Sequence, residues 1–124
     1  MISGTCLCGA VSFEVRTAPM QLTSCNCKAC SKLGTLWAYY RPEDVKITGE
    51  TLGYQRHDIE EQDGPMLTLH HCTICACITH WVDVSPTELR MGVNARLMPV
   101  EVVQAAHVRL FDGAVSFTFL DGPP

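Results

Sequence analysis

The chain has 124 residues, which is the length of one domain. Its formal net charge of −4 argues against a nucleic-acid partner, because phosphate binding needs a basic surface. Hydrophobic residues make up 47% of the chain, which excludes a disordered protein, and no apolar run reaches the roughly 20 residues that cross a bilayer. We therefore expect a single domain over residues 1–124, with no membrane and no nucleic acid among its partners.

Short strand-like runs separated by turn residues predict an all-β domain with little helix. Val11, Phe13 and Val15 alternate with polar residues, which indicates a half-buried strand that ends near Pro19. Further strands are expected at residues 36–40, 45–48, 51–55, 66–71, 78–84, 90–95, 107–111 and 115–120, with a loop at 56–65. Only residues 100–106 are suited to a helix, and that helix is short.

Eight cysteines fall into three clusters, which are Cys6-Leu-Cys8, Cys25-Asn-Cys27-Lys-Ala-Cys30 and Cys72-Thr-Ile-Cys75-Ala-Cys77. A disulfide framework spreads its cysteines along the chain, and a bridge within Cys-x-Cys strains the sulfur–sulfur geometry. The first six residues show neither the charged nor the apolar region of a signal peptide, which favours a reducing, cytoplasmic environment. In that environment, clustered cysteines indicate metal sites.

Two of these spacings suit one closed metal site. Each of the pairs Cys6-x-Cys8 and Cys72-x-x-Cys75 presents two thiolates from a tight turn, and together they form a set that we call the four-cysteine group. A tetrahedral shell of four thiolates is typical of structural zinc. Such a site ties the start of the chain to its middle and supplies roughly 10–16 kcal/mol of folding free energy.

The middle cluster offers only three thiolates within six residues, from Cys25, Cys27 and Cys30, which we call the three-cysteine group. Three protein ligands leave one coordination position open, as in catalytic zinc sites. Lys28 and Lys32 lie beside these thiols in the sequence and favour the thiolate form. The alternative is that Cys77 or a histidine completes the shell and makes a second structural site. The spacing leaves both interpretations open, and it matches neither ferredoxin pattern of an iron–sulfur cluster.

Four strings resemble the glutathione-dependent formaldehyde-activating family, which includes centromere protein V. They are GTCLCGAVSFEV at 4–15, CNCKACSKLG at 25–34, LHHCTIC at 69–75 followed by THW at 79–81, and GVNAR at 92–96. The resemblance covers about residues 4 to 97 and implies a zinc-stapled β-tent of antiparallel strands. It also implies two zinc ions, a structural one held by the four-cysteine group and a labile, catalytic one held by the three-cysteine group.

The chain departs from the family pattern just after Cys75. Ala76 stands where the family has glycine, so a backbone with positive φ is expected to be strained there. Cys77 is not needed as a ligand in the family, and we predict that it is a buried or half-buried free thiol.

Asn94 and Arg96 lie two residues apart on an expected strand, so their side chains are predicted to share one face. Arg96 is then a candidate for binding a substrate carboxylate, such as one of the two in glutathione. The alternative is an ion pair with a nearby acidic residue. We predict that both residues contribute to substrate binding.

The function that the resemblance implies is a zinc-dependent carbon–sulfur lyase or synthase acting on a thiol–aldehyde adduct such as S-hydroxymethylglutathione. Its partners are a small glutathione-like thiol and a small aldehyde, with the thiol ionised at the metal before it attacks the aldehyde carbon. The alternative is a non-catalytic binding or scaffold module stabilised by two zinc ions. An open metal site beside a pocket distinguishes the enzyme from a scaffold, which has closed shells and no cavity.

Overall fold

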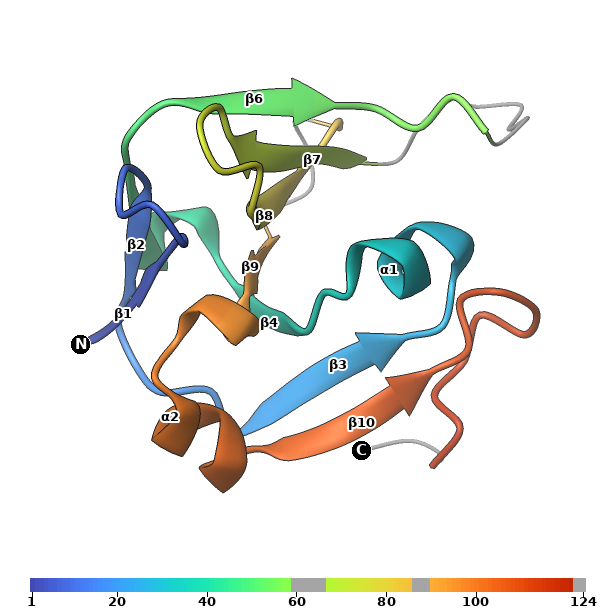
Figure 1. Ribbon diagram of the computed structural model, residues 1–124. Helices are drawn as coiled ribbons and strands as arrows, with labels where there is room; N and C mark the ends of the chain where they lie inside the picture. Colours follow the sequence, from blue (N-terminus) through green and yellow to red (C-terminus); the bar gives the residue numbers. More distant parts are fainter. Residues whose placement is uncertain (59–66, 86–89, 122–124) are drawn as a thin grey trace.

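The computed structural model describes residues 1–58, 67–85 and 90–121, and its strands form two sheets (Figure 1). The smaller sheet has the order β1–β2–β5, formed by Ile2–Thr5, Ser12–Val15 and Val45–Thr48. The larger sheet has the order β10–β3–β4–β9–β8–β7–β6, formed by His107–Phe111, Gln21–Cys25, Trp37–Tyr40, Met91–Asn94, Ile78–Asp83, Leu67–Cys72 and Thr51–Tyr54. Among the described strands, all neighbours pair antiparallel except β3 and β10, which are parallel.

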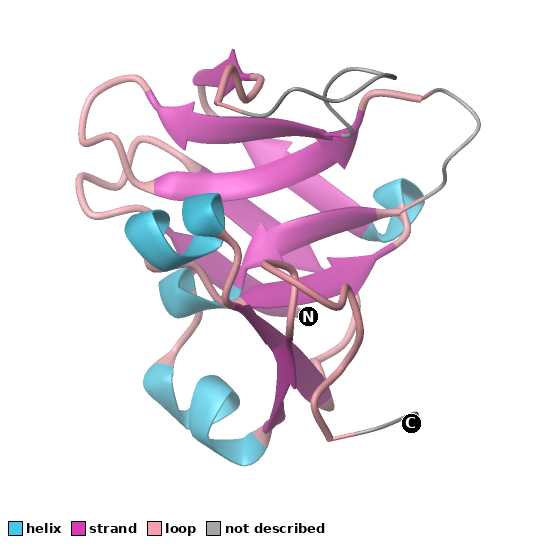
Figure 2. Cartoon of the chain, turned by 90° about the vertical axis from the view of Figure 1, so that its right-hand side faces the viewer, coloured by secondary structure: helices cyan, strands magenta, loops and turns pink. Residues whose placement is uncertain are grey.

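Four short helical segments lie around the strands, as Figure 2 shows, and they are α1 (Lys28–Leu33), α2 (Val100–Ala105), η1 (Pro42–Asp44) and η2 (Ala95–Leu97). Cys27 caps the start of α1, and its sulfur accepts the backbone N–H of Cys30. Gly34 caps the end of α1 in the left-handed conformation, with φ 69°. Within the described ranges, no helix combines the length and the apolar character needed to cross a bilayer.

The main core lies between the smaller sheet and one face of the larger sheet. Phe13 and Val15 of β2 pack there with Leu22 of β3 and with Ala38 and Val93 from the centre of the larger sheet. Each of these side chains is at most 1% exposed. Alternation along β2 leaves Glu14 exposed, which is the pattern of a strand with one buried face.

A second, smaller core lies on the other face of the larger sheet. Successive side chains of a strand point to opposite faces, so Trp37 faces away from its neighbour Ala38. Trp37 packs with Leu69 and Trp81, and Cys30 of α1 contacts this cluster. The helix α1, which carries part of the three-cysteine group, therefore packs through Cys30 against the two tryptophans of the larger sheet.

The predicted all-β domain with little helix is confirmed. Most predicted strands are found with ends that match or differ by one residue, except that the first strand ends at Val15 rather than near Pro19. These are the strands at 11–15, 36–40, 45–48, 51–55, 66–71, 78–84, 90–95 and 107–111. Residues 59–65 of the predicted loop, and Met66 at the start of one predicted strand, lie outside the described residues.

One predicted strand is wrong, and one helix and two strands were not predicted. Residues 115–120 form no strand, because Asp112 accepts the backbone N–H groups of Ser116 and Phe117 and turns the chain, leaving one isolated bridge between Phe111 and Phe119. The helix α1 was not expected, and neither were the strands at 2–5 and 21–25, whose polar and glycine residues obscure the alternation. The sheet is not wholly antiparallel, because α2 returns the chain to the start of β3, where His107 N–H donates to the Met20 carbonyl at 3.0 Å.

Candidate metal centres

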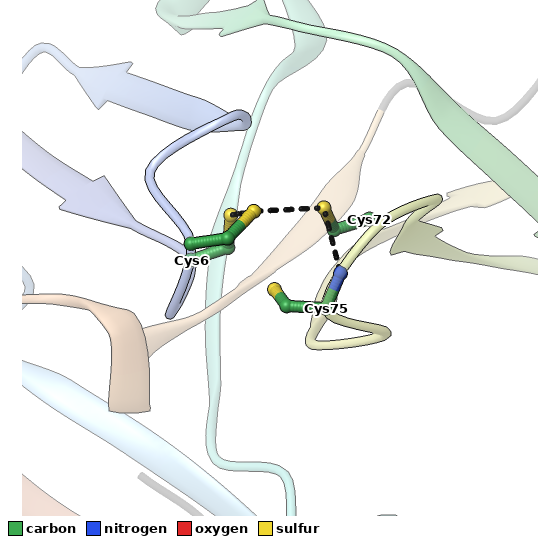
Figure 3. A group of neighbouring side chains, drawn as sticks. Cys6, Cys72 and Cys75 are labelled. Carbon is green, nitrogen blue, oxygen red and sulfur yellow. Dashed lines mark hydrogen bonds between the residues drawn. The ribbon is translucent and has the colours of Figure 1, made fainter.

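The four-cysteine group lies where turns from the two sheets meet. Cys6 and Cys8 follow β1 of the smaller sheet, whereas Cys72 ends β7 of the larger sheet and Cys75 lies in the turn before β8. Figure 3 shows the side chains of Cys6, Cys72 and Cys75 directed toward one another. All four sulfurs lie within 4.8 Å of one another, so this group joins the two sheets.

The spacing of these sulfurs fits zinc. The Cys6 and Cys8 sulfurs are 3.7 Å apart, and those of Cys8 and Cys72 are 3.6 Å apart. A tetrahedron with zinc–sulfur distances of about 2.3 Å has edges of about 3.8 Å, so a zinc ion would sit among these sulfurs with little movement. Cys6 and Cys72 are buried, which protects the site from water on its inner side.

Backbone N–H groups donate to several sulfurs of this group. Val11 N–H donates to the Cys6 sulfur at 3.3 Å, and the N–H groups of Ile74 and Cys75 donate to the Cys72 sulfur at 3.4 and 3.5 Å. The backbone N–H of Cys77, followed by that of Cys8, lowers the pKa of the Cys75 thiol to about 5. These turns therefore stabilise negative charge on the Cys75 sulfur. At Cys8 the Ala10 N–H acts in the same direction, but desolvation and the neighbouring Cys72 and Cys6 thiols outweigh it and raise the pKa to about 11.

The predictions for Ala76 and Cys77, the residues that depart from the family pattern, are both confirmed. Ala76 has φ 64°, in the left-handed region that favours glycine, and its N–H donates to the Cys72 carbonyl at 3.1 Å. Cys77 is a half-buried free thiol that packs beside the buried Cys6 and Cys72 but lies outside the group of four.

The three-cysteine group lies at the junction of β3 and α1. Cys25 is the last residue of β3, Cys27 caps α1 and Cys30 lies in its first turn, and all three are half-buried. Their sulfurs lie within 4.8 Å of one another, and no fourth histidine, cysteine or carboxylate of the described residues joins them. Cys77 lies with the four-cysteine group instead, so the structure does not bring it to this set. The donor set fits a zinc ion with three protein ligands.

Each sulfur of the three-cysteine group accepts one N–H. The donors are Cys27 N to Cys25 at 3.4 Å, Cys30 N to Cys27 at 3.3 Å, and the Trp37 indole Nε1 to Cys30 at 3.4 Å. The contact between Cys25 and Cys30 lowers the pKa of Cys25 and raises that of Cys30, which favours the proton on the Cys30 sulfur. A bound cation would displace that proton and leave three thiolates.

Trp37 was not predicted to form a hydrogen bond with a cysteine of the metal site. Its indole is only 3% exposed and donates to the Cys30 sulfur from the second core. Such donors to a ligand orient it and tune its basicity. The only signal in the sequence is an aromatic residue shortly after the cysteine cluster, and that signal does not distinguish a core residue from a donor.

A groove of about 500 Å³ opens between α1 and the strands β6 and β7. Lys28 and Lys32 of α1 and Arg56 after β6 line it together with Asp58. Asp58 accepts two hydrogen bonds from Arg56, at 3.0 and 2.7 Å, and lies 3.9 Å from the Lys28 ammonium. Three cations against one carboxylate make the groove basic on an acidic chain.

This groove lies beside the three-cysteine group. Lys28 directly follows Cys27 in the chain, and α1 carries Cys30 as well. The bond to Asp58 raises the pKa of Arg56, and the charges of Cys27 and Cys30 act in the same direction, which places the guanidinium within electrostatic reach of these thiols. None of the three cysteines lines the groove itself, so the helix α1 and the electrostatic influence on Arg56 are what connect the groove with these thiols.

Asn94 and Arg96 do not share a strand, so that prediction is wrong. Asn94 ends β9, and its side chain caps η2 by accepting the N–H of Arg96, which turns the chain out of the sheet. The Asn94 amide also accepts Leu36 N–H at 3.3 Å and donates to the Ile78 carbonyl at 2.8 Å. Arg96 Nε donates to the Gly34 carbonyl at 2.7 Å, where α1 ends. Both side chains brace the backbone around α1, and their contact with substrate stays a prediction.

The chain is similar to one family of known proteins and to a solved structure. The family model described as glutathione-dependent formaldehyde-activating enzyme matches residues 1–111. No curated protein matches the chain. A crystal structure of a Rhodobacter sphaeroides protein superposes with a TM-score of 0.64 at 23% sequence identity, and the likeness covers 86% of this chain and 98% of that one. At this identity, the likeness concerns the fold alone.

Replacing Cys75 with alanine should unfold the domain or lower its melting temperature by tens of degrees. The variant loses one of four ligands of a site whose metal supplies on the order of 10 kcal/mol of folding free energy. Circular dichroism and zinc analysis of the purified protein measure the effect. The control is Cys77→Ser, which should keep the zinc content of the wild type. An unchanged melting temperature in Cys75→Ala would contradict the structural role.

Replacing Ala76 with glycine should stabilise the protein by about 0.5–1 kcal/mol. Glycine relieves roughly 1–2 kcal/mol of strain at positive φ and costs roughly 0.5–1 kcal/mol through the entropy of the unfolded chain. Chemical denaturation of the zinc-loaded protein measures the difference. In the matched control Ala105→Gly, in the helix α2, only the entropic cost applies, so the stability should fall. A loss of stability in both variants would show that the Ala76 backbone stores no strain.

Proposed function

Because this chain belongs to the glutathione-dependent formaldehyde-activating enzyme family, we propose that it forms and cleaves the carbon–sulfur bond of a thiol–aldehyde adduct. The reaction takes place at a zinc ion held by Cys25, Cys27 and Cys30, and a second zinc ion in the four-cysteine group has a structural role. One observation carries the proposal: three half-buried sulfurs beside a basic groove, with no fourth protein ligand among the described residues.

A zinc ion bound there would lower the pKa of a thiol substrate and supply positive charge near a developing alkoxide. The chain itself holds the three ligands in place. The N–H groups of Cys27 and Cys30 and the Trp37 indole stabilise the three thiolates, and the second core fixes the orientation of Trp37. The site is therefore preorganised before the substrate arrives.

The chemistry that the site must support is an addition and its reversal. In synthesis the thiol sulfur attacks the aldehyde carbon, the carbonyl π electrons move to oxygen, and the proton lost by the thiol ends on that oxygen. In the lyase direction the hydroxyl proton leaves, the carbonyl re-forms and the carbon–sulfur bond breaks. The protein contributes by holding the thiol ionised and close to the aldehyde.

The groove supports a thiol that carries carboxylates, as glutathione does. Lys28 and Lys32 are four residues apart on α1 and so lie on one side of the helix, where both line the groove. Arg56 makes two hydrogen bonds to Asp58, and the Lys28 ammonium lies 3.9 Å from the same carboxylate, so Lys32 is the lining cation most available to a substrate. The eight thiols are all free, which fits a reducing compartment such as the cytoplasm.

Mild chelation should remove about one zinc ion per chain while the fold persists, and thiol–aldehyde exchange should stop at the same point. Three ligands with an exchangeable fourth hold a cation less tightly than four thiolates do, and the three-cysteine group closes no long loop. Cys27→Ala should likewise be folded, one zinc short and inactive. Metal analysis, circular dichroism and exchange spectroscopy with glutathione and formaldehyde measure the three properties. If both ions leave together as the protein unfolds, the scaffold alternative replaces the enzyme.

Replacing Lys28 or Lys32 with glutamine should raise the KM for glutathione about 2- to 10-fold with little change in kcat, because each lysine contributes binding that is equal in ground and transition states. The control variant is Lys46→Gln, an exposed position on β5 away from the groove. A neutral thiol such as 2-mercaptoethanol should show no change in KM with any of these variants. Equal effects on neutral and anionic thiols would exclude carboxylate recognition by the lysines.

A further inference from the structure

The segment after β10 contacts the three-cysteine group. Because β10 lies parallel to β3, their final residues Phe111 and Cys25 are paired, and the chain leaves both strands at the same end. In Figure 1 the loop after β10 lies next to the connection between β3 and α1. The Asn26 N–H donates to the Phe111 carbonyl at 3.1 Å, which continues the pairing into the metal-binding turn.

Asn26, which stands between two metal ligands, is held by this segment through its side chain as well. Its amide nitrogen donates to an Asp112 carboxylate oxygen at 3.0 Å, and its amide oxygen accepts the Ala114 N–H at 3.0 Å. Asp112 is itself fixed by the N–H and hydroxyl of Ser116, at 3.1 and 2.8 Å. The Cys25–Cys27 turn is thus held at three points by one short loop.

Gly113 lies directly against the ligands. A Cβ atom at this position would lie 2.6 Å from the Cys25 sulfur and 3.2 Å from the Cys27 Cβ. Gly113 does not have the positive φ seen at Gly9, Gly34 and Gly49, so what requires glycine here is space rather than backbone conformation. Any larger residue would have to displace the loop or the Cys25 ligand.

We propose that residues 112–116 form a clamp that positions Cys25 and Cys27 for metal binding, with Asp112 and Gly113 as its positioning residues. The family model matches residues 1–111, and the clamp follows directly after that region. It acts on the metal ligands and touches no part of the groove. Removing partners that orient metal ligands typically lowers metal affinity 10- to 100-fold, which sets the expected size of the effect.

The test compares cobalt binding in four proteins. Mild chelation removes the labile ion from the wild type and from Gly113→Ala, Asp112→Ala and Val115→Ala, and each protein is then titrated with Co²⁺. Gly113→Ala adds bulk against Cys25, whereas Asp112→Ala removes the bond to Asn26 without adding bulk, so one variant remains informative if the other fails to fold. Val115 is 87% exposed in the same loop and serves as the control.

Both clamp variants should bind Co²⁺ 10- to 100-fold more weakly than the wild type, with a changed visible d–d spectrum, while the melting temperature set by the four-cysteine group stays close to that of the wild type. Val115→Ala should behave as the wild type. Unchanged affinity and spectra would overturn the proposal, and so would weaker binding that appears only together with a large loss of stability. The measurement requires no turnover, so an inactive wild type would count against the proposed function and leave the clamp intact.

Discussion

The sulfur contact on which the fold depends joins residues that are far apart in the chain. The sulfurs of Cys8 and Cys72 lie 3.6 Å apart although 64 residues separate them. One comes from a turn of the smaller sheet and the other from a strand of the larger sheet. A cation bound there closes a long loop, and the entropy that this removes from the unfolded chain adds to the stability of the pair of sheets.

The three-cysteine group has the opposite relation to the fold. Its ligands lie within six residues, so binding a cation there fixes little of the rest of the chain. Its support comes instead from packing: Trp37 donates to Cys30 from a buried core, and α1 ends at a carbonyl held by Arg96. The two groups both use cysteine thiolates but suit different roles. The four-cysteine group connects distant elements, whereas the three-cysteine group is a local, preorganised turn.

The cysteine spacings predicted the four-cysteine group, because short turns fix the geometry of each pair. They left open whether Cys77 or a histidine completes the three-cysteine group. The strained backbone at Ala76 was predicted from the family resemblance, which has glycine at that position, because alanine itself does not indicate a positive φ. The helix α1 was missed because its start depends on a cysteine cap and its seating on Trp37. Residues 115–120 were mistaken for a strand, because Val115 and Phe117 alternate with polar residues although the side chains of both are exposed. Contacts such as Asn26 with Asp112 connect residues 86 positions apart, and no local pattern indicates them.

The central claim is that one metal site is closed by protein and the other is open. A crystal structure of the zinc-loaded protein, with diffraction data collected on both sides of the zinc absorption edge, tests it most directly. The account predicts two anomalous peaks per chain. One should lie about 2.3 Å from the sulfurs of Cys6, Cys8, Cys72 and Cys75, and the other at the same distance from Cys25, Cys27 and Cys30 with a fourth ligand that is not protein. A single peak, or a second peak surrounded by four protein ligands, would contradict the account.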